Sequence, residues 1–365
     1  MYLKELSLVQ FKNYPELRLP LDAQINCFVG PNGSGKTNLL DAIYYLSFCK
    51  SYFNPVDSQN VRHGDEFFVI EGWYQRQERP EHLYLGVKKG QKKSVRRNKK
   101  KYDRISEHIG LFPLVIISPS DRDLILEGSD VRRKFIDGVI AQSNKRYLDD
   151  LLQYNRILQQ RNSLLKYFAA NRSFDATSLE TYDEQLDPLA ERIHQDRKEF
   201  LDRFIPIFQK YYSDISGGAE EVGVEYQAKL GEQSLQLVLF ECREDDRRRQ
   251  HTTQGTHKDD LEFTLQGYPI KRTGSQGQQK TFLIALKLAQ FTFLKELTGI
   301  TPILLLDDIF DKLDDQRVGA LIRMVEEHRF GQIFLSDTHF ERTESLVKQF
   351  NESYRMYTVC KGEVK

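Results

Sequence analysis

Apolar and polar residues alternate along much of the N-terminal third of the chain, a period of two that is typical of strands with one buried face. The alternation is clearest at residues 3–9 and 17–21, which flank a turn at residues 11–15. Residues 25–29 form instead a short, largely apolar run. Further strands are predicted at residues 67–73, 82–87 and 114–117.

The period changes to about 3.5 residues in the middle of the chain, as in helices that pack along a narrow apolar stripe. Two long runs show this period, at residues 148–168 and 182–211, and a polar turn at residues 171–178 separates them. The pattern predicts an antiparallel helical arm. Pro188 and Pro206 lie inside the second run, and we expect them to kink or interrupt the helix.

Strand signals return after Gly217 and Gly218 and mix with one further helix, predicted at residues 282–294. Residues 243–249 are highly charged, and we expect them to be exposed. The α/β segments therefore flank a helical insertion. The strands predicted in this part are residues 222–230, 261–265, 303–306 and 333–335.

The composition limits the classes of protein to consider. Hydrophobic residues make up 39% and charged residues 29% of the 365 residues, as in ordinary soluble globular proteins. Lys plus Arg and Asp plus Glu both number 53, so DNA or a membrane would have to be contacted through a local patch. The four cysteines form no CxxC pair, which argues against a disulfide scaffold or a zinc site. Neither a signal peptide nor an apolar run of the roughly 18 residues that span a membrane is visible, so we expect a cytoplasmic protein without membrane contact.

A phosphate-binding loop follows the apolar run at residues 25–29. It fits the pattern G-x-x-x-x-G-K-[ST] in full and lies between a predicted strand and a predicted helix. Lys36 is expected to reach the β- and γ-phosphates, and the Thr37 hydroxyl is expected to bind Mg²⁺. The pattern therefore predicts binding of a nucleoside triphosphate, taken to be ATP, with magnesium. The loop consists of Gly30, Pro31, Asn32, Gly33, Ser34, Gly35, Lys36 and Thr37.

Two adjacent acids, Asp307 and Asp308, follow the apolar strand predicted at residues 303–306. In phosphate-loop ATPases a carboxylate at such a strand end completes the coordination of Mg²⁺, which is the role expected of Asp307. Asp308 is expected to polarise the attacking water and so to be a catalytic residue together with Lys36. A solvated loop start is the alternative interpretation of this acidic pair.

The two halves of this site are about 270 residues apart, and an insertion of that length resembles the ABC-type ATPase heads of the SMC and RecF group. Such heads carry a signature loop at a helix start before the second acidic motif, where this chain has Ser275, Gly277 and Gln278. In that superfamily the loop contacts the γ-phosphate held by another subunit, whereas the alternative is a polar helix cap. The resemblance also makes residues 311–314 a D-loop and His339 a switch histidine that contacts the γ-phosphate.

Four segments narrow the resemblance to the RecF family. Residues 6–14 resemble the opening of RecF proteins, residues 119–137 the entry to their helical arm, and residues 256–261 a further RecF stretch. Residues 275–280 are close to the RecF form of the signature. The resemblance covers nearly the whole chain, which is identified as a member of this family.

The resemblance implies an α/β fold, an ABC-type (SMC/RecF-like) P-loop ATPase head with an inserted antiparallel helical arm. The head is expected at residues 1–119 and 217–365, and the arm at residues 120–216. The implied function is ATP-dependent DNA binding in recombinational repair and replication, with weak DNA-dependent ATP hydrolysis as a switch. Two copies would sandwich two ATP molecules as an ATP-dependent homodimer. The implied partners are double-stranded and gapped DNA, RecR, RecO and the recombinase RecA on single strands, with a link to the SOS response.

Three positions depart from the pattern of related heads. No glutamine follows the strand predicted at residues 114–117, where many heads place a magnesium-sensing side chain, and Asp121 is the nearest candidate. Asp308 stands where many SMC-type heads have Glu, and a shorter side chain suits slow turnover. Lys12 stands where related heads often have an Arg, so the resemblance implies that it lies near the nucleotide.

Residues 88–101, here called the basic hairpin, contain nine cations and no acid. So dense a cationic segment is expected to bind DNA phosphates without reading bases, with an affinity that falls as salt rises. A solvated hairpin or a site for acidic proteins is the alternative. The expected DNA-binding residues are Lys88, Lys89, Lys92, Lys93, Arg96, Arg97, Lys99, Lys100 and Lys101.

Three other functions fit parts of the sequence. A transporter ATPase would have a signature closer to LSGGQ and would need neither a helical arm nor a basic hairpin. A nuclease-fused relative would carry a further acidic metal domain. A non-enzymatic, ATP-gated scaffold would share every motif, and only the effect of hydrolysis on DNA residence distinguishes it.

Overall fold

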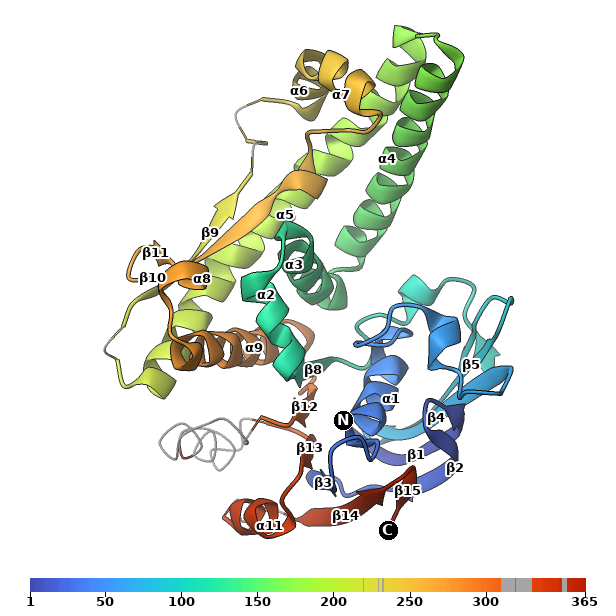
Figure 1. Cartoon of the computed structure of the whole chain (residues 1–365), viewed down its shortest axis with the longest axis vertical. Coiled ribbons are helices and arrows are strands. Elements are labelled where there is room, and N and C mark those ends of the chain that lie inside the picture. The colour runs from blue at the N-terminus through green and yellow to red at the C-terminus, as the bar shows by residue number, and fades with distance from the viewer. Residues whose placement is uncertain (219, 229, 232, 310–318, 320–329, 350–352) are drawn as a thin grey trace. The chain divides into compact units, whose positions relative to one another are not determined.

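The computed structural model describes residues 1–365 apart from 219, 229, 232, 310–318, 320–329 and 350–352 (Figure 1). Its contacts divide the chain into two compact units. The first unit comprises Met1–Asp121, Asp214–Gly217 and Leu283–Lys365, and the second comprises Arg122–Ser213 and Gly218–Phe282. Residues 218–282, which we expected in the ATPase head, thus cluster with the helical arm. The predicted D-loop at residues 311–314 lies outside the described residues.

The first unit contains a six-stranded, mostly parallel sheet of order β15-β14-β3-β13-β12-β8. Strands β3, β12 and β13 are buried at every residue, because strands of a parallel sheet are covered on both faces. That burial explains the uninterrupted apolar runs in the sequence. The strands are β3 (Ile25–Val29), β8 (Leu114–Ile117), β12 (Ile303–Asp307), β13 (Ile333–Asp337), β14 (Tyr354–Cys360) and β15 (Glu363–Val364).

The second sheet of this unit is antiparallel and has the order β2-β1-β4-β5-β6-β7. Along β4 and β5, buried side chains alternate with partly exposed ones, so one face of the sheet packs into the core and the other does not. This is the alternation from which the strands were predicted. The strands are β1 (Tyr2–Phe11), β2 (Tyr14–Pro20), β4 (Phe67–Arg76), β5 (Arg79–Lys88), β6 (Ser94–Arg97) and β7 (Lys100–Lys101).

Helix α1 (Lys36–Phe48) lies in the core of the first unit. It contacts β4 of the antiparallel sheet and β8, β12 and β13 of the parallel sheet, so it joins the two layers. Ten of its thirteen residues are buried, which explains why its apolar positions surround the helix rather than form a narrow stripe. The helix begins directly at Lys36, so the phosphate loop is held between two buried elements. Helix α11 (Phe340–Lys348) contacts β3.

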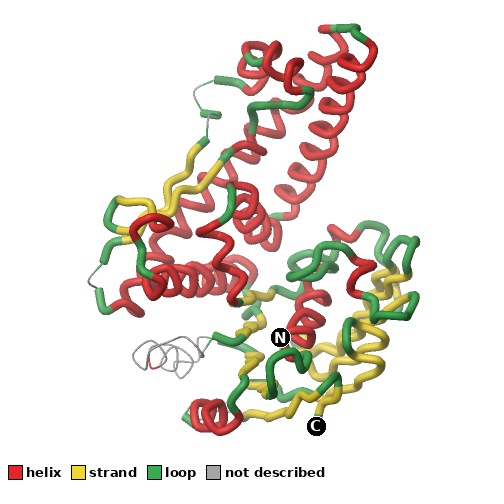
Figure 2. Tube along the Cα trace, viewed as in Figure 1, coloured by secondary structure: helices red, strands yellow, loops and turns green. Residues whose placement is uncertain are grey.

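The second unit is mainly helical (Figure 2). Its two long helices, α4 (Lys145–Asn171) and α5 (Ala176–Ser216), are antiparallel, because ion pairs join Arg146 to Asp196 and Arg161 to Asp183. This confirms the predicted helical arm. The remaining helices are α2 (Asp123–Leu126), α3 (Ser129–Ser143), α6 (Leu235–Glu241), α7 (Arg243–Arg249), α8 (Ile270–Thr273) and the first part of α9 (Gln276–Thr298).

Helix α5 continues through both prolines, so the expected interruption does not occur. A proline inside a helix costs about 3 kcal/mol. Around Pro188 the helix buries Leu186, Leu189 and Ala190, and a buried leucine contributes about 1.5–3 kcal/mol. Packing on either side of the proline is therefore large enough to offset its cost.

A three-stranded sheet of order β11-β10-β9 completes the second unit. Its strands are β9 (Val222–Gln227), β10 (Asp260–Leu265) and β11 (Tyr268–Pro269). The charged segment at residues 243–249 forms α7 and is less exposed than expected. Glu244, Arg248 and Arg249 are exposed, three residues are partly buried, and Asp246 is fully buried against Arg161.

Two expectations about the whole chain can be compared with the structure. All four cysteines are free, in agreement with the absence of a disulfide scaffold. Within the part of the chain that the structure describes, no helix combines the length and apolar character needed to cross a lipid bilayer.

Candidate nucleotide-binding site

The phosphate loop connects the end of β3 to the start of α1, as predicted. Lys36 is buried, and its Nζ donates to the carbonyl oxygens of Gly30 (2.9 Å) and Pro31 (3.2 Å). The ammonium group therefore lies within the curve of the loop, where phosphate-loop proteins bind the β- and γ-phosphates. The N-terminus of α1 adds the unpaired N–H groups and positive dipole end that favour an anion.

Gly35 shows why this loop needs glycine. Its φ angle is +117°, in the left-handed region, and a Cβ there would collide with Asn13 and Tyr14. Asn13 donates from Nδ2 to the carbonyl of Ser34 (3.1 Å), and the Tyr14 hydroxyl donates to the carbonyl of Gly35 (3.0 Å). The turn between β1 and β2 therefore supports the loop from outside. The sequence predicted a turn at residues 13 and 14 and a family resemblance, but not their support of the loop.

The C-terminal hairpin β14–β15 supports the same loop. The Gly362 N–H donates to the carbonyl of Ser34 (3.2 Å), and a Cβ on Gly30 would collide with the carbonyl of Val359. The Gly30 N–H in turn donates to the carbonyl of Asp337 at the end of β13 (3.2 Å). Residues from both ends of the chain thus hold the loop in place. No element beyond residue 340 was expected from the sequence, so this support was not predicted.

Thr37 and Asp307, predicted as the two magnesium ligands, lie in contact although 270 residues separate them, with Thr37 Oγ1 donating to Asp307 Oδ1 at 3.0 Å. Ser336 donates to the same carboxylate oxygen at 2.7 Å. Burial raises the pKa of Asp307, and the hydrogen bonds from Ser336 and Thr37 partly offset this. The Thr37 hydroxyl and the buried Asp307 carboxylate are close enough to bind the same ion. They suit Mg²⁺, which is usually coordinated by one or two protein oxygens together with phosphate oxygens and water.

Asp308 has a different environment from its neighbour. It is partly exposed, has a φ of 46°, and its N–H donates to Ser336 Oγ at 3.0 Å. Ser336 thus bridges the two acids and sets their relative orientation. A left-handed backbone conformation is uncommon outside glycine, although Asp adopts it more readily than most residues.

His339 is the residue before the first turn of α11, makes no side-chain capping hydrogen bond and is exposed. Asp337, two residues before His339, accepts hydrogen bonds from the Arg342 guanidinium (2.8 Å) and the Thr343 hydroxyl (2.9 Å). Burial opposes ionisation of Asp337, but these donors outweigh it, so its pKa lies below the usual range. Because Asp337 also bonds to the start of the phosphate loop, the loop that carries His339 is linked to the nucleotide site. No role for Asp337 was predicted from the sequence.

Two further candidates have partners inside the protein. Lys12 forms a 2.5 Å ion pair with Asp41, which is fully buried on α1. Asp121, the candidate for the missing glutamine, forms a 2.6 Å ion pair with Lys287, and both side chains are buried. Asp121 also accepts a hydrogen bond from the Ser118 N–H (2.8 Å). These contacts show structural roles for both side chains.

The signature loop lies in the second unit, at the start of α9. Ser275 and Gln278 form a reciprocal cap, in which the Ser275 N–H donates to Gln278 Oε1 (2.7 Å) and the Gln278 N–H donates to Ser275 Oγ (3.2 Å). Ser275 remains exposed, and Gly277 follows it in the first turn of the helix. The cap orients the Ser275 hydroxyl and leaves this helix start accessible to a ligand.

Two of the segments that resemble RecF lie in contact within the second unit. Arg132 on α3 forms a bidentate pair with Asp260 (2.7 and 2.9 Å). Arg197 on α5 joins Asp137 of the first segment to Asp259 of the second (2.9 and 2.8 Å). Their charged residues therefore have a structural role, which is to tie α3, α5 and β10 together.

The basic hairpin consists of the end of β5 together with β6, β7 and their turns. Lys93 donates to the carbonyl of Cys49 (2.7 Å), and Arg97 Nε donates to Glu81 (2.9 Å), so these two cations are engaged within the protein. The other seven side chains are exposed. They are Lys88, Lys89, Lys92, Arg96, Lys99, Lys100 and Lys101.

Comparison with known proteins gives consistent matches over the full length. The model of the RecF/RecN/SMC N-terminal domain family matches residues 2–365. A DNA replication and repair protein RecF from Flavobacterium johnsoniae is 53% identical over 359 residues, which cover 98% of this chain and 100% of that protein. The protein of the same description from Phocaeicola vulgatus is 49% identical over 366 residues, covering 100% of this chain and 98% of that one.

Solved structures agree with these matches. The recombination mediator protein RecF with ATP, of the RecFOR pathway, superposes with a TM-score of 0.91 at 30% identity, covering 100% of this chain and 97% of that one. An SMC head bound to the C-winged helix domain of ScpA gives a TM-score of 0.60 at 15% identity, covering 100% and 96%. The second similarity shows the shared ABC-type fold alone.

Proposed function

The chain belongs to the RecF family of DNA replication and repair proteins, and from this premise we propose that two copies assemble around ATP into a DNA-binding switch. As a member of this family, it is an ATP-binding ATPase of DNA repair. The observation that carries the proposal is the 3.0 Å contact between Thr37 and Asp307, since it joins the two halves of an ATP site across 270 residues. A solitary phosphate loop would predict only triphosphate binding.

Each ATP site is proposed to combine residues of two copies. Lys36, Thr37 and the two acids of one copy bind the triphosphate, and the signature loop of the other copy contacts the γ-phosphate. The exposed Ser275 hydroxyl at the start of α9 supports this, because it stands beside the N–H groups of a 23-residue helix and suits an anion. ATP then stabilises the dimer by binding both surfaces at once.

The hydrolytic step is assigned to residues of the first unit. Thr37 and Asp307 would hold Mg²⁺, which supplies charge neutralisation at the phosphates when bound. Asp308 orients and polarises the attacking water, held in position by its backbone bond to Ser336. Lys36 stabilises the charge that develops on the phosphates, and His339 contacts the γ-phosphate. Loss of the γ-phosphate removes the ligand of the signature loop and favours dissociation, so slow hydrolysis acts as a timer.

The DNA contact is assigned to the seven exposed cations of the basic hairpin. They belong to one edge of the antiparallel sheet, and no acidic residue interrupts them in the sequence. Such a surface binds phosphates irrespective of sequence. The family further supports action at gapped DNA with RecR and RecO to load RecA, a DNA-dependent ATPase activity and a cytoplasmic location.

The shared site can be tested by light scattering with and without ATP. We expect ATP to convert wild-type monomers into dimers. Lys36→Ala should lose ATP binding and dimerisation together, whereas Ser275→Arg should bind ATP normally and stay monomeric. Ser345→Arg, the same change at an exposed position of α11, serves as the matched control and should dimerise. Normal dimerisation of Ser275→Arg would refute the composite site.

A further inference from the structure

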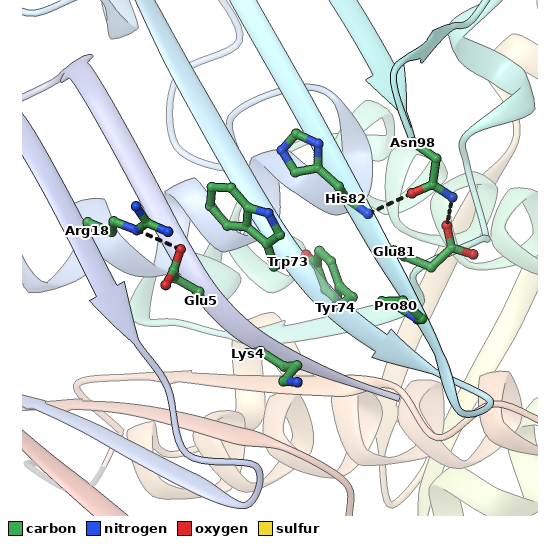
Figure 3. Close-up of a pocket in the computed structure, with 9 residues that line it drawn as sticks. All are labelled: Lys4, Glu5, Arg18, Trp73, Tyr74, Pro80, Glu81, His82 and Asn98. Atoms are coloured by element: carbon green, nitrogen blue, oxygen red, sulfur yellow. Dashed lines mark hydrogen bonds and ion pairs between the residues drawn. The ribbon is translucent and has the colours of Figure 1, made fainter.

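The outer face of the antiparallel sheet carries the only tryptophan of the chain, Trp73. On β4, Tyr74 is buried in the core while Trp73 and Glu71 are partly exposed, so Trp73 lies on the face that the core does not cover. Its indole stacks on the His82 ring of β5, with centroids 4.9 Å apart and planes inclined by 25°. The Arg18 guanidinium of β2 lies 5.5 Å from the indole (Figure 3).

An open pocket of about 450 Å³ surrounds this ring. Figure 3 shows Trp73 between Arg18 and His82, with Lys4 and Asn98 at the rim. The pocket is therefore formed by four adjacent strands, β2, β1, β4 and β5, and by the turn that follows β6. A partly exposed indole with a planar cation beside it is a surface on which a further flat ring can stack.

A second aromatic ring on the same face leads to the basic hairpin. Tyr84 of β5 is partly exposed, and its strand partners are Glu71 on one side and Arg96 on the other. The Arg96 guanidinium lies 5.1 Å from the Tyr84 ring, and Arg96 pairs in turn with Lys101 of β7. Stacking groups and phosphate-binding groups thus share one continuous sheet.

Charge is graded across this face. Near Trp73, Arg18 is paired with Glu5 (2.8 Å) and His82 lies 3.1 Å from Glu71, so the surroundings of the indole are nearly neutral. Beyond Tyr84, the hairpin presents seven exposed cations and no acid. The arrangement is that of single-strand binding surfaces, which combine a cationic track for the backbone with aromatic rings for the bases.

We propose that this face binds unpaired nucleotides, with bases stacked on Trp73 and Tyr84 and the phosphates held by Arg96 and the hairpin lysines. The inference rests on the proposed DNA binding of the basic hairpin and adds a second, strand-selective component to it. A duplex buries the faces of its bases and engages only the cations. An unpaired strand beside a duplex engages both surfaces.

Because Trp73 is the only tryptophan, its fluorescence reports on this face alone. We expect a short oligothymidine strand to quench the emission of the full-length protein. A duplex of equal length and heparin should bind without quenching, since neither offers free bases. Binding is followed independently by the anisotropy of labelled DNA.

Substitution provides the second arm of the test. Trp73→Ala should weaken single-strand binding about tenfold and leave duplex binding unchanged, while Trp73→Phe should retain most of the affinity. Tyr268→Ala, which removes a ring that is 65% exposed in the second unit, is the matched control and should have no effect.

The outcomes separate this inference from the one on which it rests. Oligothymidine that binds without quenching Trp73 would overturn the stacking face and leave the hairpin proposal intact. Failure of every DNA to bind would overturn the hairpin proposal. Quenching by an acidic peptide but not by oligothymidine would assign the face to a protein partner and overturn the nucleic-acid proposal.

Discussion

Asp307 and Asp308 are neighbours in sequence, but their surroundings differ and suit the separate roles that we propose for them. Asp307 is buried, accepts two hydroxyl donors and faces Thr37. Asp308 is turned by its left-handed backbone towards a more exposed position. One acid is thereby suited to hold a cation, and the other to orient water.

Asp308→Asn tests whether hydrolysis sets the time spent on DNA. The amide keeps the size of the side chain but is a poor base, so we expect ATP hydrolysis to fall at least about 100-fold with ATP binding unchanged. DNA dwell time, measured on single molecules with ATP, should lengthen accordingly. Glu16→Gln, at an exposed position of β2, is the control. Equal dwell times for wild type and Asp308→Asn would favour the passive scaffold.

His108 makes the stability of the first unit depend on pH. It is fully buried, its Nε2 lies 2.7 Å from the carbonyl of Leu46, and its Nδ1 lies 3.2 Å from the Tyr102 hydroxyl. Burial lowers its pKa from 6.5 to about 4. The unfolded chain therefore binds a proton more readily than the folded one, and stability falls as the pH drops from about 6.5 to about 4.

His108→Gln should remove this dependence, because glutamine can still donate to the Leu46 carbonyl but does not titrate. Over that pH range we expect the free energy of unfolding of wild type to fall by about 3 kcal/mol more than that of the variant. Urea unfolding followed by Trp73 fluorescence measures the difference at several pH values. Parallel losses in the two proteins would show that other groups cause the acid sensitivity.

At the scale of elements, the buried Arg197 shows what sequence patterns omit. Residues 132–137 and 256–261 were noticed only because they resemble a family, and nothing in their spacing indicated that they meet. The structure explains them by one guanidinium that bonds Asp137, Asp259 and the carbonyl of Thr256. Its partners lie about 60 residues away on either side, beyond the reach of any local period.

Arg197→Met should destabilise the second unit by about 3–5 kcal/mol, since it leaves the buried Asp259 and the partly buried Asp137 without their cation. Arg192→Met removes a bidentate pair with Asp150, but Arg192 is 41% exposed, so its loss should cost about 1 kcal/mol or less. Circular dichroism reports mainly on the helical second unit, and Trp73 fluorescence on the first. A comparable loss in both variants would contradict the assigned role of burial.

The elements that the sequence predicted are those whose pattern is local. Strands β3 and β12, the phosphate loop and the two long helices follow from runs, motifs and periods. The continuity of α5 does not, because burial of its neighbours offsets the proline cost. The hydrogen bonds from Asn13 and Gly362 that support the phosphate loop could not be predicted either. Each is made by a single group, which leaves no periodic pattern or motif in the sequence. The contact between Thr37 and Asp307 could be expected, because each belongs to a motif of known chemistry.

At the scale of the whole molecule, the charge balance conceals a strongly basic segment. We expect Lys99→Ala with Lys100→Ala to weaken duplex binding and to reduce the slope of log affinity against log salt by about two. Arg156→Ala with Lys166→Ala, two exposed cations of α4, should leave the slope unchanged. Anisotropy titrations across a salt series give both slopes. A larger effect of the α4 pair would move the main DNA contact to the helical arm.

The order of strands in the parallel sheet has a consequence for how the protein is made. β3 leaves the ribosome early, yet both of its partners, β13 and β14, are synthesised about three hundred residues later. At roughly 5 to 20 residues per second, its five core residues wait about 15 to 60 s for the strands that will cover them. During that time the nascent chain carries an unpaired apolar strand followed by an incomplete nucleotide loop. Chaperones are therefore expected to bind this segment. A truncated product without β14 and β15 would lack the contacts of Val359 and Gly362 with the phosphate loop.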